Sequence, residues 1–376
     1  MRYRRFGKTN RSISLFSLGT MRFLTSESVA LETMQRAIAL GVNHFETAQG
    51  YGESEVFLGR ALKQGLGIPR SDLFLTTKLT PTSDAAMMAA AIDRSLERLG
   101  VDYVDGLALH GVNTEEHLRW IEAPDGCMQA VRAAIADGRV RYVGFSTHGS
   151  LDLILRAIAT DQFAFVNLHY YYFFQRHQPA IELAYQKDMG VFIISPADKG
   201  GLLYTPPARL QEQCRPFDPL NLTYRFLLSD PRITTLSTGP ANPDELESIR
   251  AVMERDEPLS AAEKQALENL LVQQRLRLGA ERCSQCYECL PCPEFINIPE
   301  VLRLRNLAIA HDMTEYGRYR YGMFERAGHW FPGRRGDRCT DCGDCLPRCP
   351  ENLDIPTLLR DTQARLGGNP RRRLWE

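Results

Sequence analysis

Short apolar runs alternate with amphipathic segments along the first two-thirds of the chain. The apolar runs have the length of buried strands and lie at residues 15–20, 42–48, 73–79, 103–110, 140–147, 163–170, 190–196 and 233–239. Helical periodicity fills the intervals, over Val29–Leu40, Glu53–Lys63, Asp84–Leu99, Met128–Asp137, Leu151–Ala159, Ala180–Lys187, Leu220–Leu228 and Pro243–Met253. Eight strands alternating with eight helices predict an α/β fold in which a parallel sheet closes into a (β/α)8 TIM barrel. A doubly wound open sheet is the alternative, but no GxGxxG follows the first strand.

Polar residues collect at the carboxyl ends of these strands, where TIM barrels place their chemistry. Glu46, Tyr51, Lys78 and His110 belong to three consecutive strands and the loops that follow them. Singly, each has an ordinary structural interpretation, such as a loop aromatic or a buried histidine with its hydrogen bonds satisfied. Together they indicate a polar cavity, because ionisable groups that end apolar strands cost desolvation free energy unless they face one.

At these residues the sequence resembles the aldo-keto reductase superfamily. The similarity rests on "RYRRFGKTNRSISLFSLGT", "HFETAQGYGESE", "TTKL" and "LALHG", and it covers about residues 1–255. The resemblance implies an NAD(P)H-dependent oxidoreductase that reduces an aldehyde or ketone to an alcohol. In that reaction Tyr51 is the general acid, Lys78 lowers its pKa, His110 hydrogen-bonds the substrate carbonyl and Glu46 pairs with Lys78. A phenol with a pKa near 10 needs such a neighbouring cation to donate its proton readily.

The same resemblance implies a binding site for NADP(H) or NAD(H). "VGFSTH" and "STGPANPDELESI" lie where the family binds the nicotinamide and the adenosine phosphate. The implied cofactor-binding residues are Thr20, Ser146, Thr147, Asn167, Ser195, Thr238 and Gly239. Three departures stand out: Glu46 replaces the usual aspartate, Thr147 the usual asparagine and Asn167 the usual glutamine. Pro240-Ala241 stands where NADP-preferring relatives carry a basic residue, which leaves the choice between NADP and NAD open.

The last third of the chain contains an internal repeat that is rich in cysteine. "CSQCYECLPCPEFINIPEVLRLRN" and "CTDCGDCLPRCPENLDIPTLLRDT" share their cysteine spacing, a Cys-Pro-Glu and an Ile-Pro. The second copy is C-x2-C-x2-C-x3-C-P, the run that holds [4Fe–4S] clusters, whose last cysteine ligates the other cluster in two-cluster ferredoxins. We therefore assign Cys283, Cys286, Cys289 and Cys349 to one cluster, and Cys339, Cys342, Cys345 and Cys292 to the other. Zinc and disulfides are less consistent with this spacing.

The sequence thus predicts three regions. Residues 1–255 form the barrel, 256–280 a linker helix capped by Ser260 and ended by Gly279, and 281–376 a helical ferredoxin-like 4Fe–4S domain. A further helix is expected over Glu300–Ala310. The arginine-rich stretch between the two cysteine motifs is expected to screen the negative charge of the clusters.

Composition narrows the remaining function classes. The chain of 376 residues is 44% hydrophobic with a net charge of -1, which gives no general reason to expect nucleic-acid or membrane binding. No signal peptide or long apolar stretch is evident, so we expect a cytoplasmic protein. The expected partners are a small carbonyl substrate and a possible redox protein.

Two functional hypotheses follow from the two halves. In the first, the protein is a carbonyl reductase whose clusters are structural, sensory or used for docking. In the second, it is an iron–sulfur electron-transfer protein whose barrel is a scaffold or nucleotide sensor. Hydride transfer moves two electrons and a cluster moves one, so direct exchange between the halves calls for a flavin; no flavin signature is evident in the sequence.

Overall fold

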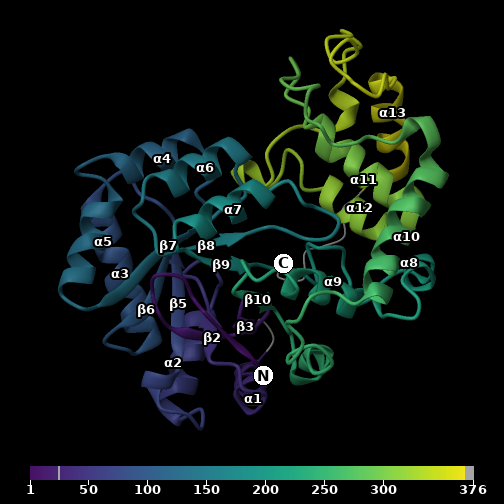
Figure 1. The fold of residues 1–376 in the computed structure, drawn as a ribbon. Helices are drawn as coiled ribbons and strands as arrows, with labels where there is room; N and C mark the ends of the chain where they lie inside the picture. Colours follow the sequence, from purple (N-terminus) through teal and green to yellow (C-terminus); the bar gives the residue numbers. More distant parts are fainter. Residues whose placement is uncertain (24–25, 369–376) are drawn as a thin grey trace. The chain divides into compact units, whose positions relative to one another are not determined.

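The computed structural model describes residues 1–23 and 26–368, and within them the chain divides into two compact units (Figure 1). The first unit contains Met1–Gly200 and Thr223–Pro258. The second contains Gly201–Leu222 and residues 259–368. The segment Gly201–Leu222 therefore belongs to the second unit although it lies within the sequence range expected for the barrel. Residues 369–376, the end of the expected ferredoxin-like domain, lie outside the described residues.

The first unit is a closed barrel of parallel strands in the order β10-β3-β4-β5-β6-β7-β8-β9. The strands are β3 (Phe16–Gly19), β4 (His44–Glu46), β5 (Phe74–Leu79), β6 (Val104–Leu109), β7 (Val140–Ser146), β8 (Phe165–Leu168), β9 (Gly190–Ile193) and β10 (Thr235–Thr238). Each coincides with one of the expected apolar runs, and the prediction of a TIM barrel is confirmed. Because all eight strands are parallel, their carboxyl ends open at the same end of the barrel.

Helices of this unit follow the strands much as the periodicity indicates: α1 (Glu27–Ala39), α2 (Ser54–Gln64), α3 (Ala85–Leu99), α5 (Cys127–Ala136), α6 (Leu151–Ala159) and α7 (Gln178–Gln186). Helix α9 (Pro219–Leu228) also matches its expected range. Two short helices were not expected, α4 (Glu115–Glu122) and α8 (Ala208–Gln213). The segment expected as the helix Pro243–Met253 is instead a 3₁₀ helix, Pro243–Ile249, capped by Asn242.

An N-terminal hairpin, β1 (Tyr3–Arg5) and β2 (Ser12–Ser14), packs on the barrel. It inserts Phe6, which is fully buried, and the ring centroid of Phe6 lies 5.3 Å from that of Phe165 and 5.7 Å from that of Phe74. Gly190 is required here, because a Cβ on it would lie 2.1 Å from the Phe6 ring. Phe6 thus fills one end of the barrel, and the polar side chains lie at the other end.

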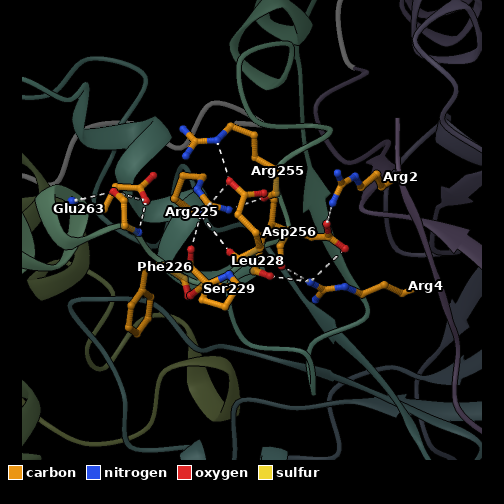
Figure 2. A network of polar contacts seen from close by, with 12 residues as sticks. Arg2, Arg4, Arg225, Phe226, Leu228, Ser229, Arg255, Asp256 and Glu263 are labelled. Atoms are coloured by element: carbon orange, nitrogen blue, oxygen red, sulfur yellow. Dashed lines mark hydrogen bonds and ion pairs between the residues drawn. The ribbon is translucent and has the colours of Figure 1, made fainter.

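Arginines tie the hairpin and helix α9 to the segment that ends the barrel (Figure 2). Arg4 donates through Nη2 to the carbonyl of Leu228 at 2.6 Å and through Nη1 to that of Ile233 at 2.6 Å. Arg225 is buried and donates to the carbonyl of Glu257 at 3.0 Å. These guanidinium groups satisfy carbonyls that helix and strand ends leave without partners.

The second unit is helical. It contains α10 (Ala261–Leu278), α11 (Ile298–His311), α12 (Thr314–Tyr321) and α13 (Ile355–Leu366) together with α8. The helix expected between Ser260 and Gly279 is α10, which belongs to the second unit: Ser260 and Glu263 form a capping box at its start, and Gly279 follows its end. Helices α11 and α13 each follow a cysteine-rich loop and carry Pro299 or Pro356 in their first turn, where proline needs no N–H partner.

The arginine-rich stretch of this unit is paired largely within the unit. Arg335 and Arg338 form ion pairs with Glu325, at 3.3 Å and 2.8 Å, and the guanidinium of Arg320 lies 4.2 Å from the ring centroid of Phe331.

Of the helices that the structure describes, none is long and apolar enough to cross a membrane.

Candidate functional site

The structure brings Glu46, Tyr51, Lys78 and His110 together at the carboxyl ends of the strands. Glu46 ends β4 and Lys78 lies near the end of β5, and their side chains form a buried ion pair, Nζ to Oε1, of 2.8 Å. The Lys78 ammonium lies 4.7 Å from the centroid of the Tyr51 ring. The ring of His110, which follows β6, meets the Tyr51 ring edge to face, with centroids 5.5 Å apart. Three consecutive strands thus place a carboxylate, an ammonium group and an imidazole around the ring of Tyr51.

The electrostatics of Tyr51 differ from the expectation. Burial raises the pKa of the Tyr51 phenol well above its usual value, and the Glu46 carboxylate raises it further. Burial also lowers the pKa of Lys78, while Glu46 opposes that shift. The ammonium lies over the face of the ring. Its charge interacts with Glu46, with the Thr47 carbonyl at 2.8 Å and with the ring itself. The phenol therefore holds its proton in this state.

Glu46 reaches across the mouth of the barrel. Its Oε1 accepts hydrogen bonds from Lys78 on β5 and from Asn167 Nδ2 on β8, the latter at 2.7 Å. The family's more usual pair is an aspartate and a glutamine, so one side chain here is a methylene longer and the other a methylene shorter. The two departures compensate in length, and this contact explains how both are accommodated.

Asn167 also carries a free acceptor. Its Oδ1 is buried and has no hydrogen-bond partner among the described residues. A buried amide oxygen costs free energy unless a donor reaches it. The carboxamide of a nicotinamide has such a donor, and the residues present therefore fit this end of the cofactor.

The hydroxyl groups of the other expected nicotinamide residues hold the surrounding loops. Ser146 Oγ accepts a hydrogen bond from the Gly111 N–H at 3.0 Å, and it retains its own proton for a ligand. Thr147 Oγ1 donates to the Val112 carbonyl at 2.7 Å. Thr20 Oγ1 donates to the Glu46 carbonyl at 3.1 Å. The hydroxyl groups of Thr147 and Thr20 thus hold neighbouring backbone segments in place through these hydrogen bonds.

The expected phosphate end lies at the end of β10. Thr238 Oγ1 donates to the Ser17 carbonyl at 3.1 Å, whereas nothing lies within 4 Å of the position that a Cβ on Gly239 would occupy. This open space above a strand end, close to the capped turn at Asn242, suits a phosphate group. Ser195, just beyond β9, has a positive φ of 52°.

Sequence reasoning missed a cation at this end of the site. Arg22, in the loop after β3, donates to the Gly239 carbonyl at 2.9 Å and forms an ion pair with Glu245 at 2.6 Å. The signal was present, because Arg22 lies two residues after the expected first strand. A basic side chain from another part of the chain thus lies beside Gly239, although none follows Gly239 in the sequence.

A second missed group is a pair of histidines that follow β7 and β8. The Nε2 atoms of His148 and His169 lie 3.0 Å apart. Tyr171 donates to the Ile194 carbonyl at 2.6 Å, so its oxygen accepts from His169 Nδ1. When both rings are neutral, this tautomer leaves His169 Nε2 as the acceptor and His148 as the donor. The pair can share a proton at the mouth of the barrel.

The eight cysteines of the second unit form two groups. Cys283, Cys286, Cys289 and Cys349 line one cavity, together with Pro299, Leu302, Leu353 and Ile355. Cys292, Cys339, Cys342 and Cys345 line another, together with Ile296, Ile298, Pro356 and Leu359. These are the same two sets that the spacing predicts, so the last cysteine of each copy turns toward the first three of the other.

Cys289 and Cys345 are buried, whereas Cys286 and Cys342 are exposed and the other four cysteines are half-buried. Burial raises the pKa of Cys289 to about 12 and those of Cys283 and Cys345 to about 11. Four soft sulfur donors around an apolar cavity fit an iron–sulfur cluster. Within residues 1–23 and 26–368, no three or more His, Cys, Asp or Glu side chains are placed so that they could hold one metal ion between them.

Comparison with known proteins agrees with both halves. Residues 16–271 match the model of the aldo/keto reductase family, and residues 282–353 match that of the 4Fe-4S dicluster domain. An uncharacterized oxidoreductase, YqkF, of Bacillus subtilis is 25% identical over 293 residues, which is 68% of this chain and 92% of that protein. Methylglyoxal reductase DkgB of Yersinia pestis is 30% identical over 149 residues, which is 39% of this chain and 52% of that protein.

Solved structures share the fold. The aldo-keto reductase AKR11C1 from Bacillus halodurans, in its holo form, superposes with a TM-score of 0.62 at 24% identity, over 71% of this chain and 95% of that one. The family implies NAD(P)H and small carbonyl substrates. The protein therefore belongs to the aldo/keto reductase family and is an oxidoreductase that carries an eight-cysteine 4Fe-4S dicluster domain after the barrel in its sequence.

Proposed function

We propose that the barrel reduces a small aldehyde or ketone to the alcohol with NADPH or NADH, and that Tyr51 supplies the proton. The observation that carries the proposal is the position of the Lys78 ammonium, 4.7 Å from the centre of the Tyr51 ring and anchored by Glu46 at 2.8 Å. The name of the Yersinia pestis relative favours methylglyoxal among the first substrates to try.

The raised pKa of Tyr51 keeps the phenol protonated before the reaction starts, and donation of the proton then depends on stabilisation of the phenolate. A phenol that holds its proton donates a hydrogen bond to a carbonyl oxygen, and the proton moves as negative charge grows on that oxygen. Lys78 then faces the developing phenolate through the ring, in a site with little water to screen the interaction. His110 lies at the edge of the same ring, where its imidazole can orient the carbonyl. General acid catalysis of this kind contributes about 10²–10⁴-fold.

The nicotinamide cofactor supplies the hydride when it is bound. Asn167 Oδ1 and the Ser146 hydroxyl are the groups that we expect to bind its carboxamide. At the other end, Ser195, Thr238 and Gly239 would line the phosphates, which the open space at Gly239 would accommodate. Arg22 would contribute a positive charge there. Arg22 is already paired with Glu245, so its contribution to phosphate binding depends on how that pair is shared.

In the second unit, we propose two [4Fe–4S] clusters with crossed ligands. Cys349 completes the set of Cys283, Cys286 and Cys289, and Cys292 completes the set of Cys339, Cys342 and Cys345. Support comes from the two cavities that these sets line. Since cluster ligands are thiolates, binding iron must displace protons from thiols whose pKa burial raises.

The test is NADPH-dependent reduction of methylglyoxal and other small aldehydes by the iron-loaded protein and its Tyr51→Phe variant. We expect the variant to lose about 10²–10⁴-fold in kcat, with the affinity for NADPH and the iron content unchanged. Tyr185→Phe, on the exposed surface of α7, is the matched control and should keep full activity. Equal turnover by Tyr51→Phe and the wild type would refute the role of Tyr51.

A further inference from the structure

The two cysteine-rich loops need a left-handed backbone at the same three places. The matched positions, with φ between 51° and 81°, are Gln285 and Asp341, Tyr287 and Gly343, and Phe295 and Asn352. The second copy fills them with aspartate, glycine and asparagine, the residues that tolerate this conformation best. The first copy fills them with glutamine, tyrosine and phenylalanine, which adopt it with strain.

Phe295 is the extreme case. Its φ is 56° and its side chain is 72% exposed, so the ring combines an unfavourable backbone with almost no burial. The ring faces the Arg334 guanidinium, 5.8 Å from its centroid, and the Phe295 carbonyl accepts a hydrogen bond from the Arg334 N–H at 2.9 Å. Asn352 occupies the equivalent place in the other loop, which shows that the loop itself does not need an aromatic side chain. The fold of this loop therefore does not explain why position 295 carries an aromatic side chain.

Phe295 is close to one of the two cysteine sites. Its N–H donates to the carbonyl of Cys292 at 2.9 Å, and Cys292 lines the cavity that also contains Cys339, Cys342 and Cys345. Leu346, next to Cys345 in the other loop, is 41% exposed, and Cys342 is itself exposed. Apolar groups from both loops thus reach the surface beside the same cluster site.

The two loops are joined at this point. Arg348 Nη2 donates to the Pro291 carbonyl at 3.0 Å, which connects the loop of Leu346 to the loop of Phe295. The Arg334 side chain is 49% exposed, and the nearest carboxylate, that of Glu294, lies 4.0 Å away. The surface around this cysteine site therefore presents an aromatic ring beside an accessible positive charge, and the second loop adds an exposed aliphatic side chain.

We propose that Phe295, Leu346 and Arg334 form a docking surface for a small electron-carrier protein with an acidic rim. Exposed aromatic and arginine side chains are the residues that most often dominate such contacts, and the positive charge selects an acidic partner. The site of Cys292, Cys339, Cys342 and Cys345 is then where one electron passes between the carrier and the domain. One centre is oxidised and the other reduced by one electron, and no atom is transferred. This inference goes beyond carbonyl reduction and does not depend on it.

The test uses the full-length, iron-loaded protein and a plant-type [2Fe–2S] ferredoxin as the acidic carrier. Isothermal titration calorimetry at low ionic strength measures its dissociation constant for the wild type and for Phe295→Asn, which copies the residue of the second loop. We expect at least a tenfold weaker affinity, a matching loss in the rate of electron transfer on rapid mixing, and an unchanged melting temperature and iron content. Phe295→Tyr, which keeps the ring, should retain the wild-type affinity.

Leu276→Asn is the matched control, because Leu276 is 73% exposed on α10, a helix that ends before the first cysteine loop begins. Four results would overturn the proposal: no binding of the ferredoxin by the wild type, equal binding by Phe295→Asn, an equal loss in Leu276→Asn, or a fall in the melting temperature of Phe295→Asn. Tyr51→Phe should bind the ferredoxin normally, so a failure of the proposed carbonyl reduction and a failure of this proposal are distinguishable.

Discussion

The buried ion pair of Glu46 and Lys78 makes the sharpest prediction, through the variant Glu46→Gln. The side chains are 4% and 2% exposed and their charges lie 2.8 Å apart. At an effective dielectric constant of ~20, Coulomb's law gives an attraction of about 6 kcal/mol at this separation. Desolvation of two ions costs several kcal/mol each, so the pair as a whole is close to neutral for stability. Removal of one partner is a different matter, because the other charge stays buried.

Glutamine keeps the shape of Glu46 and removes its charge. Lys78 must then remain charged without a counter-ion or lose its proton, and the second choice sets an upper limit. Deprotonating a lysine of ordinary pKa at pH 7 costs about 5 kcal/mol, at about 1.4 kcal/mol for each pH unit. We therefore expect Glu46→Gln to lower the free energy of unfolding by about 3–5 kcal/mol at pH 7. For a barrel of this size, that is a fall of roughly 6–20 °C in melting temperature.

The loss should depend on pH in a defined direction. Burial lowers the pKa of Lys78, and Glu46 now opposes that shift. Without Glu46 the folded-state pKa falls further, so the unfolded chain binds more protons than the folded one over a wider range below pH 10. Stability then rises with pH in this range, and the variant should approach the wild type between pH 7 and pH 9.

Urea unfolding of both proteins at pH 7, 8 and 9 measures this effect. Glu55→Gln is the matched control: Glu55 is also buried, but its partner Arg98 is 31% exposed and does not lose its proton. The control should cost less, and its cost should vary less with pH. The reasoning fails if Glu46→Gln costs less than about 1 kcal/mol at pH 7, or if its deficit is the same at pH 9.

Two further predictions concern the unusual residues Glu46 and Asn167 and the ligands of the clusters. Glu46→Asp alone should lower kcat, because the shortened carboxylate cannot reach Lys78 and Asn167 together. Adding Asn167→Gln should restore most of the loss, and a double variant no better than the single one would contradict the length compensation. Cys349→Ser should remove or alter one cluster while leaving the other with its four ligands, which iron analysis and electron paramagnetic resonance of the reduced protein measure; loss of both clusters would contradict the separate ligand sets.

Part of the site could be predicted from sequence because its determinants are local. The period of two or 3.6 in the hydrophobic pattern marks strands and helices, and parallel strands bring their carboxyl ends to one end of a barrel. Glu46, Lys78 and His110 could therefore be placed together without knowledge of any contact. The cysteine spacing is local in the same sense, and the proline and glycine at helix ends gave α10 and α11 correctly.

Other features escaped because their cause is distant or weak in the sequence. Helix α4 has only eight residues and rests on the Thr114 cap and an acidic first turn, signals that are easily passed over. Pro243–Ile249 carries the cap and proline of a helix start, but its backbone forms 3₁₀ turns instead. The contacts of Arg22 with Gly239 and Glu245, and that of His169 with His148, join residues more than twenty positions apart in the sequence.

The sequence by itself determined the strand and helix order, the identity of the ionisable groups at the strand ends, and the cysteines available to iron. Only the tertiary structure decided which atoms meet. It placed the Lys78 ammonium over the face of Tyr51, joined Glu46 to Asn167 across the barrel mouth, and exposed Phe295 beside one cysteine set while its counterpart is an asparagine. The physical reason is that local patterns set backbone conformation, whereas pKa shifts, pairing and exposure depend on neighbours that folding brings from remote parts of the chain.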